Sequence, residues 1–184
     1  MTTYISILRG INVSGHRMIK MDALKKMCAE LGFSNIQTYI QSGNIIFQAK
    51  ETDTKKLSEL IESAINKIFG FDVPTITLTK NELENIIQLN PFVNDKTKDA
   101  SFFHITFLSD NPPKEKVELL KQADLKNDEY AVGDKAIYLY CPDSYSNSKL
   151  TNSFLENKLK VIATTRNWKT SNELLNMACD MFLV

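Results

Sequence analysis

The sequence lacks the features that mark membrane and secreted proteins. None of its apolar runs approaches the roughly 18–20 residues that a membrane-spanning helix needs. Its start, Met1 to Tyr4, does not have the charged and then apolar segments of a signal peptide. Cys28, Cys141 and Cys179 are scattered, without the spacing of a disulfide framework or a zinc site. We therefore expect a globular cytoplasmic protein with reduced thiols and no membrane association.

Motifs of catalysis are also missing. His16 and His104 are the only histidines, and no spacing of His, Asp or Glu predicts a metal site. Neither a nucleophile elbow of the Gly-x-Ser-x-Gly type nor a phosphate-binding P-loop occurs. Of the two histidines, only His16 lies near the sites predicted below, where it could act as an acid or base. The sequence therefore favours binding over catalysis and predicts no cofactor and no metal.

Positive charge is concentrated in two segments, although Lys and Arg together number 22, the same as Asp and Glu. Residues 9–26 contain five Lys or Arg and one Asp, and residues 147–169 contain five Lys or Arg and one Glu. The rest of the chain is correspondingly acidic. This distribution argues against a general nucleic-acid-binding surface and allows a local anion site. Ordinary solvated surface charge explains it equally well.

Hydrophobic periodicity in residues 1–90 predicts the element order β-α-β-β-α-β, which is that of a ferredoxin-like unit. Strands are expected at residues 4–8, 36–40, 45–47 and 73–78. A first helix, with apolar residues from Leu24 to Leu31, is expected to end at Gly32, and a second at Gly70. The second helix has the clearest apolar stripe, which we expect to be buried against the sheet: Leu57, Leu60, Ile61, Ala64, Ile65 and Ile68.

The same order returns in residues 91–184, with strands expected at 102–108, 130–132, 136–140 and 161–164. Two sequences of the capping-box type predict an extra helix after each half. They begin at Thr79 and Thr170, have Glu82 and Glu173 three residues later, and lie 91 residues apart. The sequence thus predicts an α+β fold (an α/β sandwich) of two ferredoxin-like units, 1–90 and 91–184, related by internal duplication.

Topology places polar residues at one edge of each predicted sheet. In a ferredoxin-like unit, the end of the first strand and the turn between the second and third strands share an edge. In the second half, the start of the second helix would share an edge with the end of the fourth strand. The candidate ligand-binding residues at these two edges are Arg9, Asn12, Arg17, Ser42, Asn44, Lys149, Arg166, Asn167 and Trp168.

Cations, amides and hydroxyls beside turn or helix-start amides are the groups that hold phosphate or carboxylate. The strongest form of the hypothesis joins the two edges into one composite anion site between the halves. Each residue also has a structural explanation. Asn12 and Asn44 fit turns, Asn167 fits a helix start and Trp168 fits packing. The residue types alone do not separate the two explanations.

Several ordered stretches resemble the bacterial domain-of-unknown-function family 1697 over essentially the whole chain. The matching stretches are Leu8 to Val13, Tyr39 to Asn44, Phe71 to Pro74, Asn90 to Phe92, Ser148 to Thr151 and Ala163 to Trp168. The resemblance implies a soluble bacterial protein with α/β repeats, and no established reaction, cofactor or catalytic residue. Ser14 replaces a glycine usual in the family. Tyr145-Ser146-Asn147 replaces a Gly-x-Gly-Arg-like run, and the missing arginine weakens the anion site at the second edge.

Three hypotheses for the function follow. The first is a binding module for a small anionic ligand, either phosphorylated or nucleotide-like. The second is an enzyme acting on a phosphorylated small molecule, with His16 or Arg17 as the acid or electrophile. The third is a protein-interaction module whose polar loops only join the two halves. Of these the sequence favours the first and identifies neither the ligand nor the oligomeric state.

Overall fold

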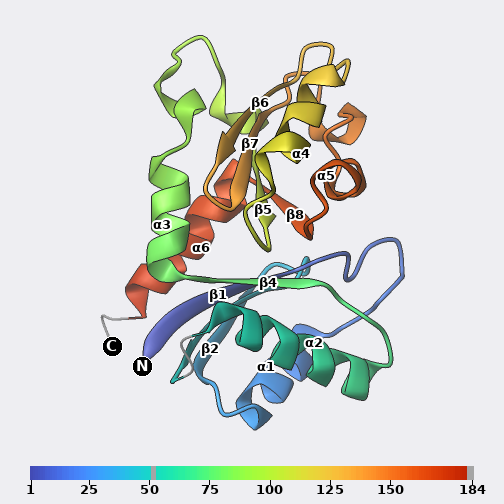
Figure 1. Cartoon of the computed structure of the whole chain (residues 1–184). Coiled ribbons are helices and arrows are strands. Elements are labelled where there is room, and N and C mark those ends of the chain that lie inside the picture. Colours follow the sequence, from blue (N-terminus) through green and yellow to red (C-terminus); the bar gives the residue numbers. More distant parts are fainter. Residues whose placement is uncertain (51–52, 182–184) are drawn as a thin grey trace. The chain divides into compact units, whose positions relative to one another are not determined.

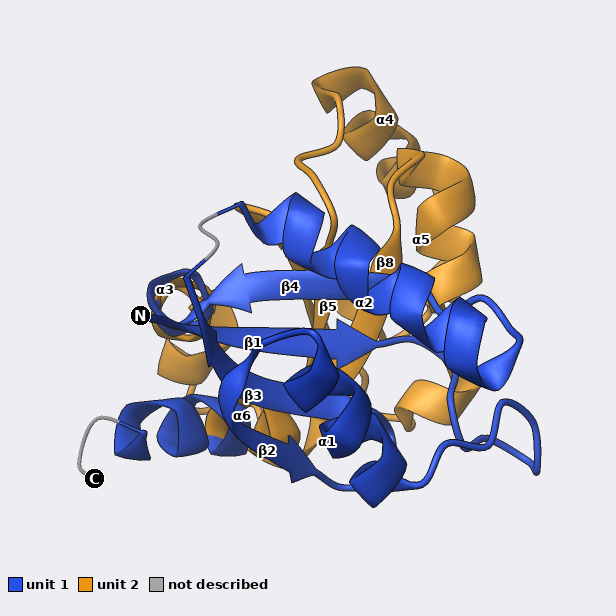
Figure 2. Cartoon of the chain, turned by 90° about the horizontal axis from the view of Figure 1, so that it is seen from below, with its two compact units in different colours: residues 1–84, 173–184 blue, residues 85–172 orange. Residues whose placement is uncertain are grey.

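The computed structural model describes residues 1–50 and 53–181, which form an α+β fold with two four-stranded antiparallel sheets (Figure 1). Grouping by contacts divides the chain into unit 1, residues 1–84 with 173–184, and unit 2, residues 85–172 (Figure 2). This division falls within two helices, α3 (Lys80–Gln88) and α6 (Trp168–Asp180). The domain boundary between residues 90 and 91 stays a prediction.

Unit 1 has the ferredoxin-like order expected from the sequence. Its elements are β1 (Thr2–Leu8), α1 (Met21–Glu30), β2 (Ser34–Tyr39), β3 (Asn44–Ala49), α2 (Thr54–Phe69) and β4 (Thr75–Thr79). The sheet order is β2-β3-β1-β4, and β1 pairs with both β3 and β4 in antiparallel fashion. Helices α1 and α2 lie on one face of this sheet, where their apolar side chains form a core with Tyr4 and Phe47 (Figure 1).

Unit 2 repeats this topology with the sheet order β6-β7-β5-β8. Its elements are β5 (Phe103–Leu108), α4 (Lys114–Glu118), β6 (Glu129–Gly133), β7 (Ala136–Tyr140), α5 (Asn152–Leu159) and β8 (Ala163–Asn167). Short 3-10 turns lie at η1 (Pro91–Asn94), η2 (Ala100–Phe102), η3 (Leu119–Gln122) and η4 (Tyr145–Asn147). The predicted α+β fold is therefore confirmed, with α3 following the first set of strands and α6 following the second.

The apolar stripe of α2 is only partly buried. Leu57, Ile61 and Ile65 are fully buried, and Ala64 packs against the same core. Leu60 and Ile68, however, are 42% and 51% exposed, so the prediction that they are buried was wrong. The buried residues repeat every four positions and follow one narrow line along the helix. Leu60 and Ile68 lie three positions from members of that line, at its margin, where the helix turns toward solvent.

The first predicted capping box is present at the start of α3. Thr79 donates its backbone N–H to Glu82 Oε2 (2.8 Å), and Glu82 donates its own to Thr79 Oγ1 (3.1 Å). The second prediction was wrong, because α6 already begins at Trp168 and Asn167 Oδ1 accepts the N–H of Thr170 (2.8 Å). Asparagine is as good a cap as threonine and directly follows β8 here. The spacing of 91 residues therefore does not relate equivalent positions.

A buried polar cluster ties α2 to the sheet of unit 1. The hydroxyls of Ser6 on β1 and Thr77 on β4 are 2.7 Å apart, and Ser58 on α2 donates to Thr77 Oγ1 (3.0 Å). One turn further along α2, Glu62 accepts the backbone N–H of Thr75 (2.7 Å). Burial raises the pKa of the Glu62 carboxyl, while that hydrogen bond lowers it. These contacts fix the position of α2 along the edge strand β4.

The equivalent cluster occurs in unit 2 between β5, β8 and α5. The hydroxyls of Thr106 and Thr165 are 2.7 Å apart, and Thr165 also bonds Asn152 Oδ1 (2.7 Å). Again one turn further along the helix, Glu156 accepts the backbone N–H of Ala163 (3.0 Å). The strand pairings place Thr106 and Thr165 opposite each other, as Ser6 and Thr77 are in unit 1. Both units therefore use the same polar anchor at the same topological position.

Candidate functional site

The long connection between β1 and α1 contains a tight hairpin, residues 12–17, beyond the end of β1 (Figure 1). Val13 and His16 form an isolated antiparallel bridge, and the N–H of His16 donates to the carbonyl of Val13 (2.9 Å). At the tip, Ser14 and Gly15 both have positive φ, +49° and +77°, as the turns favoured in two-residue hairpins require. The connection is thus a defined structure and not an irregular loop.

Asn12 holds this hairpin to the rest of unit 1. Its Nδ2 donates to the carbonyls of Ile19 (2.9 Å) and Gln41 (2.8 Å), while its Oδ1 accepts the N–H of Ile19 (2.8 Å). Both amide hydrogens are therefore used within the protein, and Asn12 has no N–H left for a ligand. The bond to Gln41 also brings the hairpin beside the turn between β2 and β3. The two parts of the first predicted edge, the connection after β1 and the turn after β2, thus lie side by side, and Asn12 joins them.

Asn44 and Ser42 have a similar supporting role in that turn. Asn44 is fully buried, and its Nδ2 donates to the carbonyl of Tyr39 (2.9 Å) and to Ser42 Oγ (3.1 Å). Between them Gly43 has a φ of +81°. A Cβ placed on Gly43 would lie 2.7 Å from the Ile11 side chain, so the turn and the β1–α1 connection are in close contact. Ser42 and Asn44 therefore shape the turn.

Arg17 is the cation of the first edge that the structure leaves available. It is exposed, and within residues 1–50 and 53–181 its guanidinium has no hydrogen-bond or ion-pair partner. The guanidinium lies beside the backbone of Gly10, where a Cβ would be 3.5 Å from Arg17 Nη1, an ordinary contact distance. Arg9, by contrast, is half-buried at the end of β1 and donates its backbone N–H to the carbonyl of Pro74 (2.9 Å). His16 is exposed at the tip of the hairpin.

The cations of the second edge are engaged within unit 2. Lys149 is exposed and lies 3.9 Å from Asp124, a long ion pair. Arg166 folds back along its own strand, where Nη1 donates to the carbonyl of Thr165 (3.0 Å) and to Thr164 Oγ1 (3.3 Å). Burial lowers the pKa of Arg166 to about 10, which still leaves the guanidinium charged at neutral pH. Neither side chain is free in the way that Arg17 is.

Asn167 and Trp168 have structural roles at the start of α6. Asn167 is the cap described above, and its carbonyl also accepts the hydroxyl of Ser171 (3.0 Å). The Trp168 ring packs edge-on against Phe103, with centroids 6.1 Å apart. The bond between Thr165 and Asn152 does bring the end of β8 beside the start of α5, as the topology predicted. The composite site that joins the two edges stays a prediction.

His104 on β5 lies in a specific environment within unit 2. Its ring stacks on Tyr145 (4.7 Å between centroids, 22° between planes), and its Nδ1 lies 3.2 Å from the carbonyl of Phe102. Burial lowers the pKa of His104 below its usual 6.5, and this effect outweighs the hydrogen bond, which raises it. Tyr145 begins the 3-10 turn η4 after β7, and no sequence pattern connects it with His104.

This environment makes stability depend on pH. Because the folded-state pKa of His104 is below 6.5, the unfolded chain binds a proton first as the pH falls. The contribution of His104 is therefore complete above pH 6.5 and is lost as the pH falls from there through the lowered pKa. Urea unfolding from pH 8 to pH 5 should show this loss, and His104→Gln should reduce it. His16→Gln, at an exposed position, is the control, and an unchanged profile for His104→Gln would contradict the assignment.

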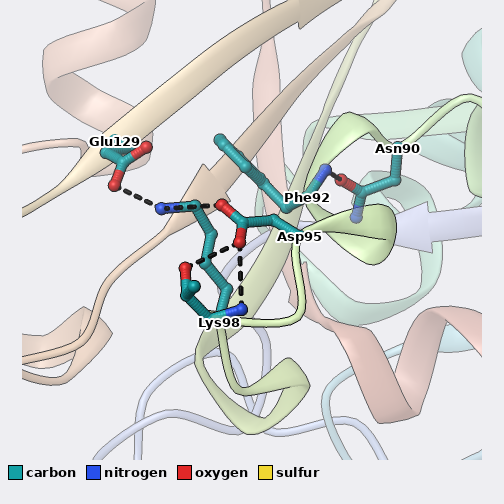
Figure 3. Close-up of polar contacts among 6 residues, drawn as sticks. Asn90, Phe92, Asp95, Lys98 and Glu129 are labelled. Atoms are coloured by element: carbon teal, nitrogen blue, oxygen red, sulfur yellow. Dashed lines mark hydrogen bonds and ion pairs between the residues drawn. The ribbon is translucent and has the colours of Figure 1, made fainter.

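Lys98 is held inside a cluster in unit 2 and is not a ligand-binding cation (Figure 3). It forms an ion pair with Glu129 on β6, and Asp95 lies 3.8 Å from its ammonium group. The same ammonium lies 4.4 Å from the ring centroid of Tyr140 and 5.7 Å from that of Phe92. Two carboxylates and two aromatic faces thus surround one charge. The cluster fastens the segment 90–102 to the sheet of unit 2.

The thiols and carboxylates give little support to catalysis or metal binding. Burial raises the pKa of Cys28 to about 12 and that of Cys141 to about 11, so neither thiol is a nucleophile near neutral pH. Across residues 1–50 and 53–181, no three His, Cys, Asp or Glu side chains are grouped to hold a metal ion. In the same part of the chain, every helix is too short or too polar to cross a bilayer.

The fold and the site define an α+β protein with two ferredoxin-like units and a cationic hairpin, residues 12–17, that the hydrogen bonds of Asn12 hold in place. The chain belongs to the family described as "Protein of unknown function (DUF1697)", whose model matches residues 1–138. The resemblance found in the sequence is thereby confirmed. The stretches 148–151 and 163–168 that contributed to it lie beyond the matched range.

A solved structure with the same fold covers nearly the whole chain. It is the conserved bacterial protein SP0830 from Streptococcus pneumoniae, with a TM-score of 0.76 and 23% sequence identity. The alignment covers 96% of this chain and 98% of that chain. At this identity the likeness establishes the fold alone. No curated protein matches the sequence.

Proposed function

We propose that this protein is a cytoplasmic bacterial binding module for a small phosphorylated or nucleotide-like anion, which it binds at the hairpin 12–17. The observation that carries the proposal is Arg17, an exposed guanidinium without a partner in the described chain, on a hairpin fixed by three hydrogen bonds of Asn12. A guanidinium can bind phosphate through two parallel hydrogen bonds. Because the hairpin is already ordered, binding costs little conformational entropy.

The charges around Arg17 support the same ligand class. No Asp or Glu occurs between residues 9 and 21, while His16 and Lys20 are exposed in that segment. An anion near the hairpin therefore meets a positive potential that no neighbouring carboxylate in the sequence reduces. In this account Asn12, Ser42 and Asn44 shape the site, and Arg17 is the residue that contacts the anion. Lys149, Arg166, Asn167 and Trp168 would contribute only if the composite site exists.

A second candidate function, protein interaction, is favoured by apolar exposure near the hairpin. Val13 is 57% exposed, Met18 62% and Ile40 48%. Val13 and Met18 flank the cationic tip in sequence, and Ile40 begins the turn to which Asn12 bonds the hairpin. Exposed apolar patches bordered by polar residues are typical of surfaces that bind a partner. This candidate predicts a partner that covers apolar surface as well as charge.

The test is a titration of the full-length protein with inorganic phosphate, AMP and ATP, followed by calorimetry and thermal unfolding. Binding should raise the melting temperature of the wild-type protein. Arg17→Ala should weaken the binding affinity about tenfold or more, and a tenfold loss corresponds to about 1.4 kcal/mol of binding free energy. Arg17→Lys should retain part of the affinity, because it keeps the charge and loses the paired geometry. Lys67→Ala, an exposed lysine in the last turn of α2, is the matched control.

Two outcomes would contradict the anion-binding proposal. One is that the wild-type protein binds none of the three probes. The other is that Arg17→Ala binds them as tightly as Lys67→Ala does. In either case the exposed apolar residues at the hairpin would make protein interaction the better candidate.

Internal duplication is supported by the shared sheet order and by the polar anchor repeated in both units. Thr165 has the position of Thr77, and Glu156 has that of Glu62. The number of residues between equivalent positions in the two units is not constant, because the loops of the two units differ in length. An origin by duplication explains why the second unit has a similar architecture and a different set of polar residues at its edge.

A further inference from the structure

Unit 2 contains a hollow of about 440 Å³ between the segments 125–128 and 143–149. Charges of both signs line it. Lys126 and Lys149 contribute the positive charges, and Asp128 and Asp143 the negative ones. Leu125 adds an apolar surface. The volume is within the range of sites that hold small molecules.

These charges do not neutralise one another. In the described chain, the ammonium of Lys126 and the carboxylate of Asp128 take part in no ion pair, and Lys149 reaches only Asp124, at 3.9 Å. Asp143 accepts a hydrogen bond from the amide of Asn127 (2.8 Å), which is neutral. The Asp128 carboxylate does take part in a hydrogen bond with the Cys141 thiol, which is also neutral. Two cations and two anions thus line a common space without a close ion pair to any other charge. A ligand that carries both charges on one small frame would complement them.

The backbone on one side of the hollow is held in an unusual conformation. Ser144 has φ +85° and ψ 135°, a region that is populated almost entirely by glycine. Its surroundings maintain it, since Asn147 donates its backbone N–H to the carbonyl of Ser144 (3.1 Å) and its amide to the carbonyl of Asp143 (2.9 Å). Strained backbone of this kind is found most often at ligand sites and catalytic sites. The strain therefore adds a second observation at the same place.

We infer that this hollow is a binding site for a small zwitterion of the free amino acid class. The α-carboxylate lies against Lys126 and Lys149, and the α-ammonium lies against Asp128 and Asp143. The site does not depend on the anion site of the hairpin, because it is formed by other residues in the other unit.

The experiment is a calorimetric titration of the full-length protein with the standard L-amino acids up to millimolar concentration. At least one should bind, and its methyl ester and its N-acetyl derivative, each lacking one charge, should bind at least about tenfold more weakly. Lys126→Ala and Asp143→Asn should each weaken binding by a similar factor. Lys121→Ala, an exposed lysine of η3 outside the hollow, is the matched control and should have no effect.

Circular dichroism and thermal unfolding would establish that each variant is folded. Lys126→Ala and Asp143→Asn remove charges of opposite sign, so the test can still be made if one of the two variants does not fold. The inference is overturned if the wild-type protein binds no amino acid. It is also overturned if binding survives in both Lys126→Ala and Asp143→Asn. Binding that is lost in Arg17→Ala would assign the amino acid to the hairpin and would likewise overturn it.

Discussion

Gly43→Ala should destabilise the protein by about 2–5 kcal/mol, one of the largest effects expected from a single methyl group in this chain. Two costs add up at this position. The φ of +81° is unfavourable for any residue with a Cβ. The new Cβ would also lie 2.7 Å from Ile11 Cδ1 and 2.8 Å from Leu8 Cβ, both of which are buried. Since Leu8 ends β1, the clash can be relieved only by moving the turn or the strand.

Gly70→Ala separates these two costs. Gly70 ends α2 with the same φ of +81°, but no atom lies within 4 Å of a Cβ placed there. Gly70→Ala should therefore lower the free energy of unfolding only by the cost of the backbone conformation, about 1–2 kcal/mol. Urea unfolding of the two variants, compared with the wild type, measures the difference. Equal losses of unfolding free energy in Gly43→Ala and Gly70→Ala would mean that Ile11 moves aside easily and that the contact between the turn and the β1–α1 connection is loose.

The elements of the fold follow from sequence patterns where a single strong pattern decides them. Gly70, at the end of the α2 stripe, is an example, because glycine is free to take the left-handed conformation that ends a helix. Asn167 shows where such reasoning fails. Two polar side chains three residues apart, Asn167 and Thr170, can both cap a helix. The one that does so is decided by where β8 ends, which depends on pairing with a strand about sixty residues earlier.

The candidate site could be predicted as a location and not as a set of ligand contacts. Topology brings the connection after β1 beside the turn after β2, and the hydrogen bond from Asn12 to the carbonyl of Gln41 joins the two. An asparagine that closes a turn and one that binds phosphate have the same identity in a sequence. Only the partners of its amide distinguish them. The amides of Asn12 and Asn44 donate to carbonyls of the chain itself and, for Asn44, also to the Ser42 hydroxyl. Arg17 is distinguished from Arg166 in the same way.

The hollow in unit 2 was beyond sequence reasoning for a related reason. Its two segments are separated by β6 and β7, and of its lining residues the sequence pointed only to Lys149, as a candidate for an anion site. What marks the place is the combination of Lys126 and Asp128, neither of which forms an ion pair in the described chain, with a strained Ser144. Each of these is a property of three-dimensional structure. A serine at a position that prefers glycine cannot be recognised until its dihedral angles are known.

Ile61→Ala should lower the free energy of unfolding by about 2–5 kcal/mol, whereas Leu60→Ala, at the next position of α2, should cost less than about 1 kcal/mol. Ile61 is fully buried on the sheet of unit 1, and its removal leaves a cavity among close-packed neighbours. Leu60 is 42% exposed, so its truncation removes far less buried surface. Helix propensity does not explain the difference, because alanine is favourable at both positions. Urea unfolding of the two variants measures it, and similar losses would place both side chains at the margin of the core.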